Sequence, residues 1–244
     1  NVSSLTAQEA STSTNKNISN SLEKLSSGLK INKASDDASG LAIADKLRTQ
    51  VTSINQGVSN GNSAIALLQI ADKSMAEQSK ILDTVKSKLI QANTDTTSQA
   101  GRTAIAKDIT KLLDQLNNIA KQTNYNGTAL LQESATNGAA KSALSFQIGE
   151  STADLIKTKT IKANVSGYSL VLLKGHVSNG AALSAGATAG TANAFTRSFA
   201  SAGQKAVDRA ITVLNGYRGD IGSTQNQVES AVRNLMTQST NIKN

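Results

Sequence analysis

The amino-acid sequence predicts a mainly α-helical protein: a long antiparallel helical bundle or coiled-coil rod with small β-hairpins at one end. Apolar residues recur at alternating steps of three and four in several separate segments, which is the spacing of helices that pack along their length. Proline is absent from the 244 residues, so the commonest cause of a helix kink is missing. Aromatic residues form only 2% of the chain, which disfavours a compact core built around large rings.

The heptad positions are the residues that we expect to face other helices. They are Ile18, Leu22, Leu25 and Leu29; Leu47, Val51, Ile54 and Val58; Leu68, Ala71, Met75, Leu82, Val85 and Leu89; Ile105, Ile109, Leu112, Leu116 and Ile119; and Val207, Ile211, Leu214, Ile221, Val228, Val232, Leu235 and Ile242. Gln78, Arg218 and Gln225 interrupt these seams. Such seams suit a core or a subunit interface. We assign to core packing Leu68, Leu82, Val85, Ile109, Leu116, Ile221, Val228 and Leu235.

Polar segments divide the helices. Residues 28–40 are rich in residues that cap or break helices, which predicts a non-helical connector before a helix from Leu41 to about Gln91. A polar turn at 93–98 precedes the next helix. Asn126-Gly127 favours positive backbone φ angles and predicts a tight turn.

Beyond this turn the apolar period shortens to two. Leu144, Phe146 and Ile148 alternate with other residues, as do residues 156–163, which predicts short β-hairpins. Residues 177–202 are rich in Gly, Ala, Ser and Thr, so we expect a small or flexible excursion that buries little.

Composition and motifs argue against an enzyme and against several partner classes. The net charge of +8 comes from dispersed basic residues with few aromatics, so we expect no nucleic-acid binding. No run of about 18 apolar residues predicts a membrane span. Cys is absent and His176 is the single histidine, so we expect no metal site, cofactor or catalytic residue, and we interpret His176 as a surface residue. The Gly-rich stretch 178–190 lacks the lysine of a phosphate loop.

Four motifs in order resemble the bacterial flagellins, similar to the Campylobacter- and Helicobacter-related type. They are LEKLSSGLKINKASDDASGLAIADKLR (22–48), QTNYNGTALL (122–131), FQIG (146–149) and RGDIGSTQNQVESAVRNL (218–235). The resemblance covers about 1–164 and 203–244. It implies a structural, non-enzymatic subunit that self-assembles into an extracellular flagellar filament for motility, with the flagellar export apparatus, a secretion chaperone and the filament cap as further partners. The alternatives are a hook-filament junction protein and a chemoreceptor-like signalling coiled coil.

The resemblance also implies a division of the chain. We expect a filament-wall helix over 1–30, a helical core with β-hairpins over 31–164 and 203–244, and a variable, surface-exposed excursion over 165–202. The chain begins at Asn1 without Met and stops at Asn244 inside a helical pattern. We therefore expect that both extreme termini of the natural protein are missing, including the partner of the first helix.

Three sets of residues are candidate functional positions. We expect Asp36, Asp37, Arg48 and Gln50 to make subunit contacts. We also expect the two acids to cap a helix, rather than to bind calcium or catalyse hydrolysis. In the family, a Toll-like receptor recognises a helix motif that resembles LQRVRELA, and this motif aligns here with residues 82–89. Thr84, Ser87 and Lys88 replace the Arg, Glu and Leu of the motif. We therefore expect weak or absent recognition by the receptor. Candidate acceptors of O-linked sugars are Ser178, Ser184, Thr188, Thr191, Thr196 and Ser198.

Overall fold

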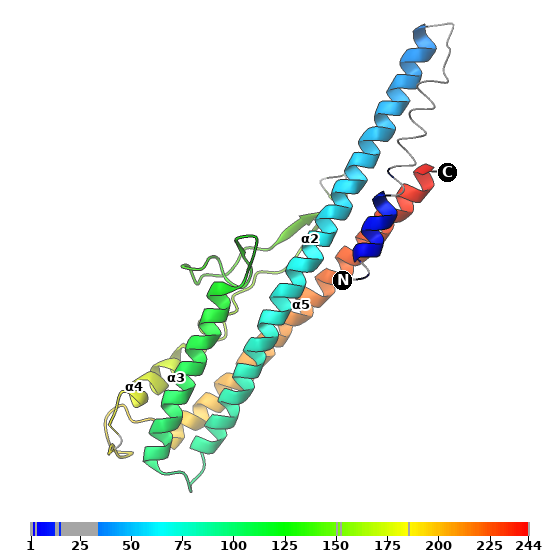
Figure 1. The fold of residues 1–244 in the computed structure, drawn as a ribbon. Coiled ribbons are helices and arrows are strands. Elements are labelled where there is room, and N and C mark those ends of the chain that lie inside the picture. The colour runs from blue at the N-terminus through cyan, green and yellow to red at the C-terminus, as the bar shows by residue number, and fades with distance from the viewer. Residues whose placement is uncertain are drawn as a thin grey trace. The chain divides into compact units, whose positions relative to one another are not determined.

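A computed structural model describes residues 2, 4–12, 15, 34–149, 151, 153–184 and 186–243. Its elements are α2 (Ala34–Ala92), α3 (Gln99–Gln122), β1 (Asn124–Tyr125), β2 (Thr128–Ala129), β3 (Ser145–Gln147), β4 (Leu155–Lys157), α4 (Val171–Ala181) and α5 (Arg197–Lys243) (Figure 1). The strands form two antiparallel pairs, β1 with β2 and β3 with β4. The prediction of a mainly α protein with long helices and small β-hairpins is confirmed.

The chain divides into two compact units. Unit 1 contains Asn1–Ala66, Ser145–Lys157 and Ser223–Asn244, and unit 2 contains Leu67–Leu144 and Thr158–Gly222. The boundaries fall inside α2 and α5, so each of these helices contributes to both units. The division expected from the sequence, into 1–30, 31–164 with 203–244, and 165–202, stays a prediction.

The long helix α2 begins earlier than the sequence predicted. It starts at Ala34, so residues 34–40 are helical and not part of a connector. Acidic residues favour the first turn of a helix because they complement its dipole, and Asp36 and Asp37 occupy that turn. The rest of the predicted connector and the seam residues Ile18, Leu22, Leu25 and Leu29 lie outside the described residues.

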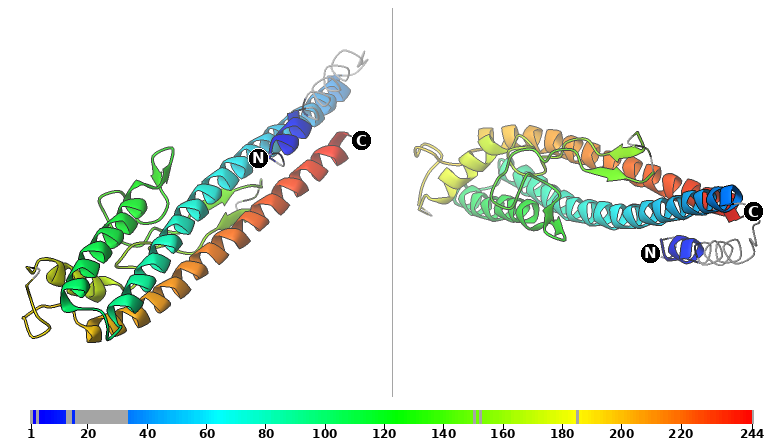
Figure 2. Two further views of the ribbon diagram at one scale, coloured as in Figure 1. Left: turned by 60° about the horizontal axis from the view of Figure 1, so that its bottom comes forward. Right: turned by 90° about the horizontal axis from the view of Figure 1, so that it is seen from above.

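In unit 2, α3 and the first part of α5 both run antiparallel to the second part of α2. As residue numbers rise along α2, the numbers of the residues they bond to fall along both neighbours, and α3 follows the second part of α2 in both views of Figure 2. The polar pairs are Gln78 with Leu116, Lys88 with Asp108, Lys86 with Asp208 and Asp72 with Arg218.

The apolar interior of unit 2 follows the heptads closely. Leu68, Met75, Leu82, Val85 and Leu89 are all fully buried. On α3 the stripe is turned slightly from the predicted one. Leu113 and Ala120 are fully buried, whereas the predicted positions Leu112 and Ile119 are half-buried. The buried side of α3 is turned in this way because α3 packs against both α2 and α4.

The hairpins form where the alternating pattern predicted them. The turn between β1 and β2 contains Asn126 at φ 49° and Gly127 at φ 83°, as the Asn-Gly pair indicated. In the second hairpin Phe146 pairs with Ile156. Both strands of this hairpin are short, only Ser145–Gln147 and Leu155–Lys157.

The range 165–202 is more structured than the expected excursion. It contains α4, and Tyr168, Val177 and Phe195 are fully buried. Gly180 allows this packing, because a Cβ there would lie 2.7 Å from the Cβ of Phe195. The small residues of this segment therefore permit close contact, and only the stretch from Ser184 to Asn193 is mainly exposed.

Candidate interaction surfaces

The first part of α2, in unit 1, is exposed on almost every side. Leu41 and Ile43 are 57% and 58% exposed, and between residues 37 and 50 only Ala44 is buried. Arg48 bonds to Asp45 three residues earlier on the same helix, and both side chains are exposed. A helix that leaves large apolar side chains in water has surface available for a partner.

The predicted contact residues lie on or next to this exposed stretch. Asp37 is exposed in the first turn of α2, and Arg48 is exposed one turn beyond Ala44. Gln50 is half-buried. The side chain of Asp36 lies outside the described residues.

Further along unit 1, two glycines allow the β3–β4 hairpin to rest on α2. A Cβ on Gly57 would lie 2.1 Å from the backbone oxygen of Ile148 and 2.6 Å from Cδ1 of Leu235. A Cβ on Gly61 would lie 2.3 Å from Cγ2 of Val232. The two glycines stand one turn apart and form a notch that admits the hairpin backbone and α5 together.

Hydrogen bonds and a groove border this notch. Asn60 Nδ2 donates to the carbonyl oxygen of Gln147 at 2.6 Å, fixing the hairpin to α2. A groove of about 860 Å³ is lined by residues of α2, the β3–β4 hairpin and α5. Figure 2 shows the arrows of β3 and β4 beside α5. The lining of the groove combines apolar side chains with amides: Ile54, Ile148, Ile156, Leu235, Ile242, Gln50, Asn234, Gln238 and Asn241.

In unit 2 the residue that interrupts the α2 seam is the centre of a buried polar network. Gln78 is fully buried, and its Nε2 donates to the carbonyl oxygens of Ala163 at 2.7 Å and Leu116 at 3.3 Å. Its Oε1 accepts a hydrogen bond from the hydroxyl of Tyr168 at 2.7 Å. Burial raises the pKa of Tyr168, with a smaller contribution from Tyr217. Every polar atom of the Gln78 side chain is therefore satisfied inside the unit.

The other two interruptions occur on α5. Arg218 Nε donates to Asp72 Oδ1 at 2.9 Å, and this hydrogen bond raises the pKa of Arg218. Gln225 is half-buried and donates to Glu229 at 3.3 Å. Polar residues in a seam are thus accommodated by pairing across helices or along one helix.

The positions aligned with the receptor motif are on the outer side of α2 in unit 2. Thr84 and Ser87 are exposed, and Lys88 is half-buried with its Nζ 3.3 Å from Asp108 Oδ2. Leu82, Val85 and Leu89 are fully buried. The packing positions of the motif are therefore inside and the substituted ones are accessible.

The hydroxyls proposed as sugar acceptors differ in exposure. Ser184, Thr188, Thr191 and Ser198 are exposed, and Ser178 and Thr196 are half-buried. Thr191 Oγ1 accepts a hydrogen bond from the backbone N–H of Thr188 at 3.0 Å.

The described residues contain no group of three or more His, Cys, Asp and Glu side chains suited to a metal ion. None of their helices has the length and apolar character to cross a bilayer. His176 is half-buried, and its ring stacks on Phe199 with centroids 3.9 Å apart, so it packs between α4 and α5 instead of projecting from a loop.

Comparison with known families agrees with the arrangement of the helices along the chain. A family model described as the bacterial flagellin N-terminal helical region matches residues 1–136. A second, described as the bacterial flagellin C-terminal helical region, matches residues 204–244. The two matches include all of α2 and α3 and most of α5.

Individual relatives agree with the family match. Flagellin B of Helicobacter pylori is 44% identical over 169 residues, covering 69% of this chain and 31% of the relative. Flagellin A of Helicobacter mustelae is 47% identical over 157 residues, covering 64% and 30%. A crystal structure of Bacillus cereus flagellin shares the fold with a TM-score of 0.54 at 22% identity, covering 71% of this chain and 86% of that one. The chain matches about a third of the length of its Helicobacter relatives.

Proposed function

Because the chain belongs to the bacterial flagellin family, we propose that it is a structural subunit that self-assembles into the extracellular flagellar filament. The observation that carries this proposal is the exposed first part of α2, where Leu41 and Ile43 lie in water in the single chain. Burying an apolar side chain of this size stabilises an association by roughly 1.5–3 kcal/mol. The relatives are named as flagellins, which favours a filament subunit over a junction protein or a signalling coiled coil.

The proposed contact surface combines these apolar residues with Asp37, Arg48 and Gln50. Charged and amide groups around an apolar centre set orientation and exclude wrong partners more than they add affinity. Asp36 belongs to the same proposal from its place in the sequence. The export apparatus, a secretion chaperone and the filament cap are proposed partners on family membership alone.

Assembly of the natural protein tests the function and the surface together. We expect electron microscopy of cells producing it to show long tubular filaments, and a Leu41→Ser, Ile43→Ser variant to be produced at normal levels but to form few or none. The matched control is Leu172→Ser in unit 2, which is 77% exposed and outside the proposed surface. Filaments from the double variant at the normal length and number would contradict the surface, and no filaments from the unmodified protein would contradict the function.

We also propose that the protein is a weak ligand of the Toll-like receptor for flagellin. Thr84 and Ser87 offer no planar cation or acid on the exposed side of α2, and Lys88 is engaged with Asp108. Losing a central anchor commonly weakens an interface by about 2 kcal/mol. A reporter-cell assay comparing the chain with a Thr84→Arg, Ser87→Glu, Lys88→Leu variant tests this. Potent signalling by the unmodified chain is the contrary result.

Sugar attachment to the segment near Ser184 is a further proposal. Ser184 and Ser198 are exposed and their hydroxyls make no hydrogen bond within the described residues, which favours them over the half-buried Ser178 and Thr196. The mass of the native protein should exceed the sequence mass, with the excess lost in a Ser184→Ala, Ser198→Ala variant. Equality of the native and sequence masses would exclude the modification.

A further inference from the structure

Unit 2 contains an open cavity at the end of α3 that none of the contacts above uses. Its volume is about 350 Å³, within the range of about 300–1,000 Å³ typical of small-molecule sites. The polar side chains that line it come from α3, from the loop after β2 and from the segment before α4: Asn117, Lys121, Gln132, Thr136, Lys162, Asn164 and Ser166. The lining contains no acidic residue.

The floor of the cavity is held rigidly by buried amides. Gln132 and Asn164 are 3% and 5% exposed. Asn164 Nδ2 donates to Gln132 Oε1 and to the carbonyl oxygen of Gly138, both at 2.8 Å. Asn164 Oδ1 accepts from the N–H of Gly167 at 2.8 Å. Such fixed polar groups give a site its geometry before any ligand arrives.

Several hydrogen-bond donors at the cavity have no protein acceptor within the described residues. Asn117 uses its Oδ1 to accept from the N–H of Val165 at 2.9 Å, and its amide N–H groups have no partner in the described part of the chain. Gln132 Nε2 donates to the carbonyl oxygen of Ser134, which leaves its second N–H. Lys121 and Lys162 form no ion pair with any carboxylate in the described part of the chain. A site with spare donors, two ammonium groups and no acid favours an anion.

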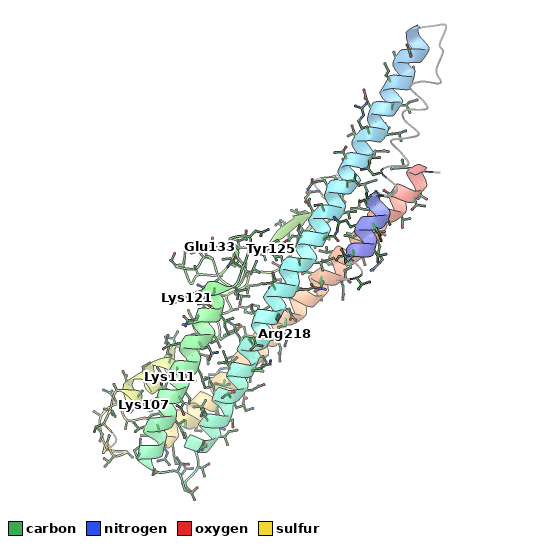
Figure 3. The ribbon with its side chains drawn as sticks, viewed as in Figure 1. Lys107, Lys111, Lys121, Tyr125, Glu133 and Arg218 are labelled. Carbon is green, nitrogen blue, oxygen red and sulfur yellow. The ribbon has the colours of Figure 1, made fainter. Side chains whose placement is uncertain are left out.

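The helix α3, which ends at the cavity, carries charges of both signs. Lys107, Lys111 and Lys121 follow one another along α3 in Figure 3, and all three are exposed. Asp108 and Asp114 lie among them but pair with Lys88 and Lys174, each at 3.3 Å. Glu133, also labelled in Figure 3, is half-buried next to Gln132 in the sequence, yet it does not line the cavity and pairs with neither lysine.

We propose that this cavity binds a small phosphate monoester, with Lys121 and Lys162 contacting the phosphate. A dianion with three terminal oxygens suits two ammonium groups and the amide donors of Asn117 and Gln132. The cavity is larger than a phosphate alone requires. The hydroxyls of Ser166 and Thr136, which also line the cavity, suit a hydroxyl-rich body attached to that phosphate.

Titration of the 244-residue chain with glucose 6-phosphate, inorganic phosphate and glucose tests the proposal. We expect saturable binding of glucose 6-phosphate, followed by NMR shifts of the Asn117, Gln132 and Asn164 side-chain amides, with a Kd on the order of 1 mM. Inorganic phosphate should bind several-fold more weakly and glucose should not bind. Lys121→Gln and Lys162→Gln should each weaken binding about tenfold, because each removes a charge-assisted bond.

The control separates a site from general attraction to a basic surface. Lys107→Gln removes an equal charge from the same helix outside the cavity and should change the Kd less than twofold, and circular dichroism should show all variants folded. The proposal fails if binding does not saturate, or if Lys107→Gln weakens binding as much as Lys121→Gln. It also fails if glucose or inorganic phosphate binds as well as glucose 6-phosphate.

Discussion

The two parts of α2 have the same heptad spacing but different surroundings. In unit 2, residues 67–92 place Leu68, Met75, Leu82 and Leu89 in a fully buried interior. In unit 1, residues 34–66 leave Leu41 and Ile43 more than half exposed. The predicted seam is buried in both parts, because Val51, Ile54 and Val58 of unit 1 are also buried. The exposed apolar residues of unit 1 precede this seam, at the start of α2, which is why the proposed contacts with other copies are placed there.

The buried stretches of the two parts are packed in different ways. The unit 2 part of α2 contains large side chains at successive seam positions, and its polar member, Gln78, is satisfied by Tyr168 and two backbone carbonyls. The unit 1 part instead uses Gly57 and Gly61, where backbone and side chains of other segments approach within the space of a Cβ. The interior next to α2 in unit 2 is packed by large side chains of α2, whereas in unit 1 the two glycines of α2 let other segments approach its backbone.

The largest expected effect on stability comes from truncating a buried side chain in the unit 2 part of α2. Leu82→Ala should lower the free energy of unfolding by about 3 kcal/mol, because Leu82 is fully buried and truncation leaves a cavity. Leu41→Ala, with its side chain 57% exposed, should change it by less than about 0.5 kcal/mol. Chemical denaturation of both variants measures the contrast. Equal losses would mean that the two parts of α2 do not differ as described.

The notch in unit 1 gives the second effect. Gly57→Ala should destabilise the chain by about 2 kcal/mol, because the added Cβ would overlap the backbone oxygen of Ile148, 2.1 Å away, and overpacking of this kind typically costs 1–3 kcal/mol. Gly216→Ala is the matched control, since no atom lies within 4 Å of the Cβ position. It should stabilise the helix by about 0.5–1 kcal/mol.

Thermal unfolding should therefore move in opposite directions for these two Gly→Ala changes. The amide resonance of Gln147 should also shift in Gly57→Ala, because the hairpin has to leave its bond to Asn60. Two variants that both raise the melting temperature would show that the hairpin adapts without cost and that the notch is not specific.

The sequence predicted the helices and hairpins well, because heptads, the Asn-Gly turn and period-two alternation act locally. It did not predict the exposure of Leu41 and Ile43, which lie outside the predicted seams. Gln78 was interpreted only as a gap, because its partners Ala163 and Tyr168 are distant in the sequence. Phe195 was placed in an exposed excursion because its neighbours are small, although small neighbours are what allow it to be buried.

The candidate site residues were predicted unevenly for the same reason. Asp37 and Arg48 are exposed, as a contact surface requires, but their role in subunit contacts stays a prediction. The lining of the cavity near Lys121 could not be predicted, because Lys162 and Asn164 join it through the fold and have no motif spacing. Nor does the sequence indicate which glycines lie against a neighbour: Gly57 and Gly216 both interrupt helical patterns, and only their surroundings separate them.

The smallest effect tests whether the polar network in unit 2 excludes solvent. Burial raises the pKa of Tyr168 above its ordinary value near 10, so the neutral phenol is favoured in the folded chain. Its contribution to stability is complete below about pH 10 and is lost as the pH rises, because the unfolded tyrosine ionises there and the folded one does not. The slope for one proton is about 1.4 kcal/mol per pH unit.

Tyr168→Phe should cost about 1 kcal/mol at neutral pH, because it removes the hydrogen bond to Gln78. This difference in stability from the unmodified chain should close within about one pH unit above pH 10. Tyr125→Phe, at a half-buried position of strand β1, is the matched control for the loss of a phenol elsewhere in the chain. Urea unfolding between pH 8 and 11 measures the three curves. If the unmodified chain and Tyr168→Phe stay parallel through this range, the phenol is open to solvent, and the contrast between the interior of unit 2 and the exposed start of α2 in unit 1 would have to rest on the apolar residues alone.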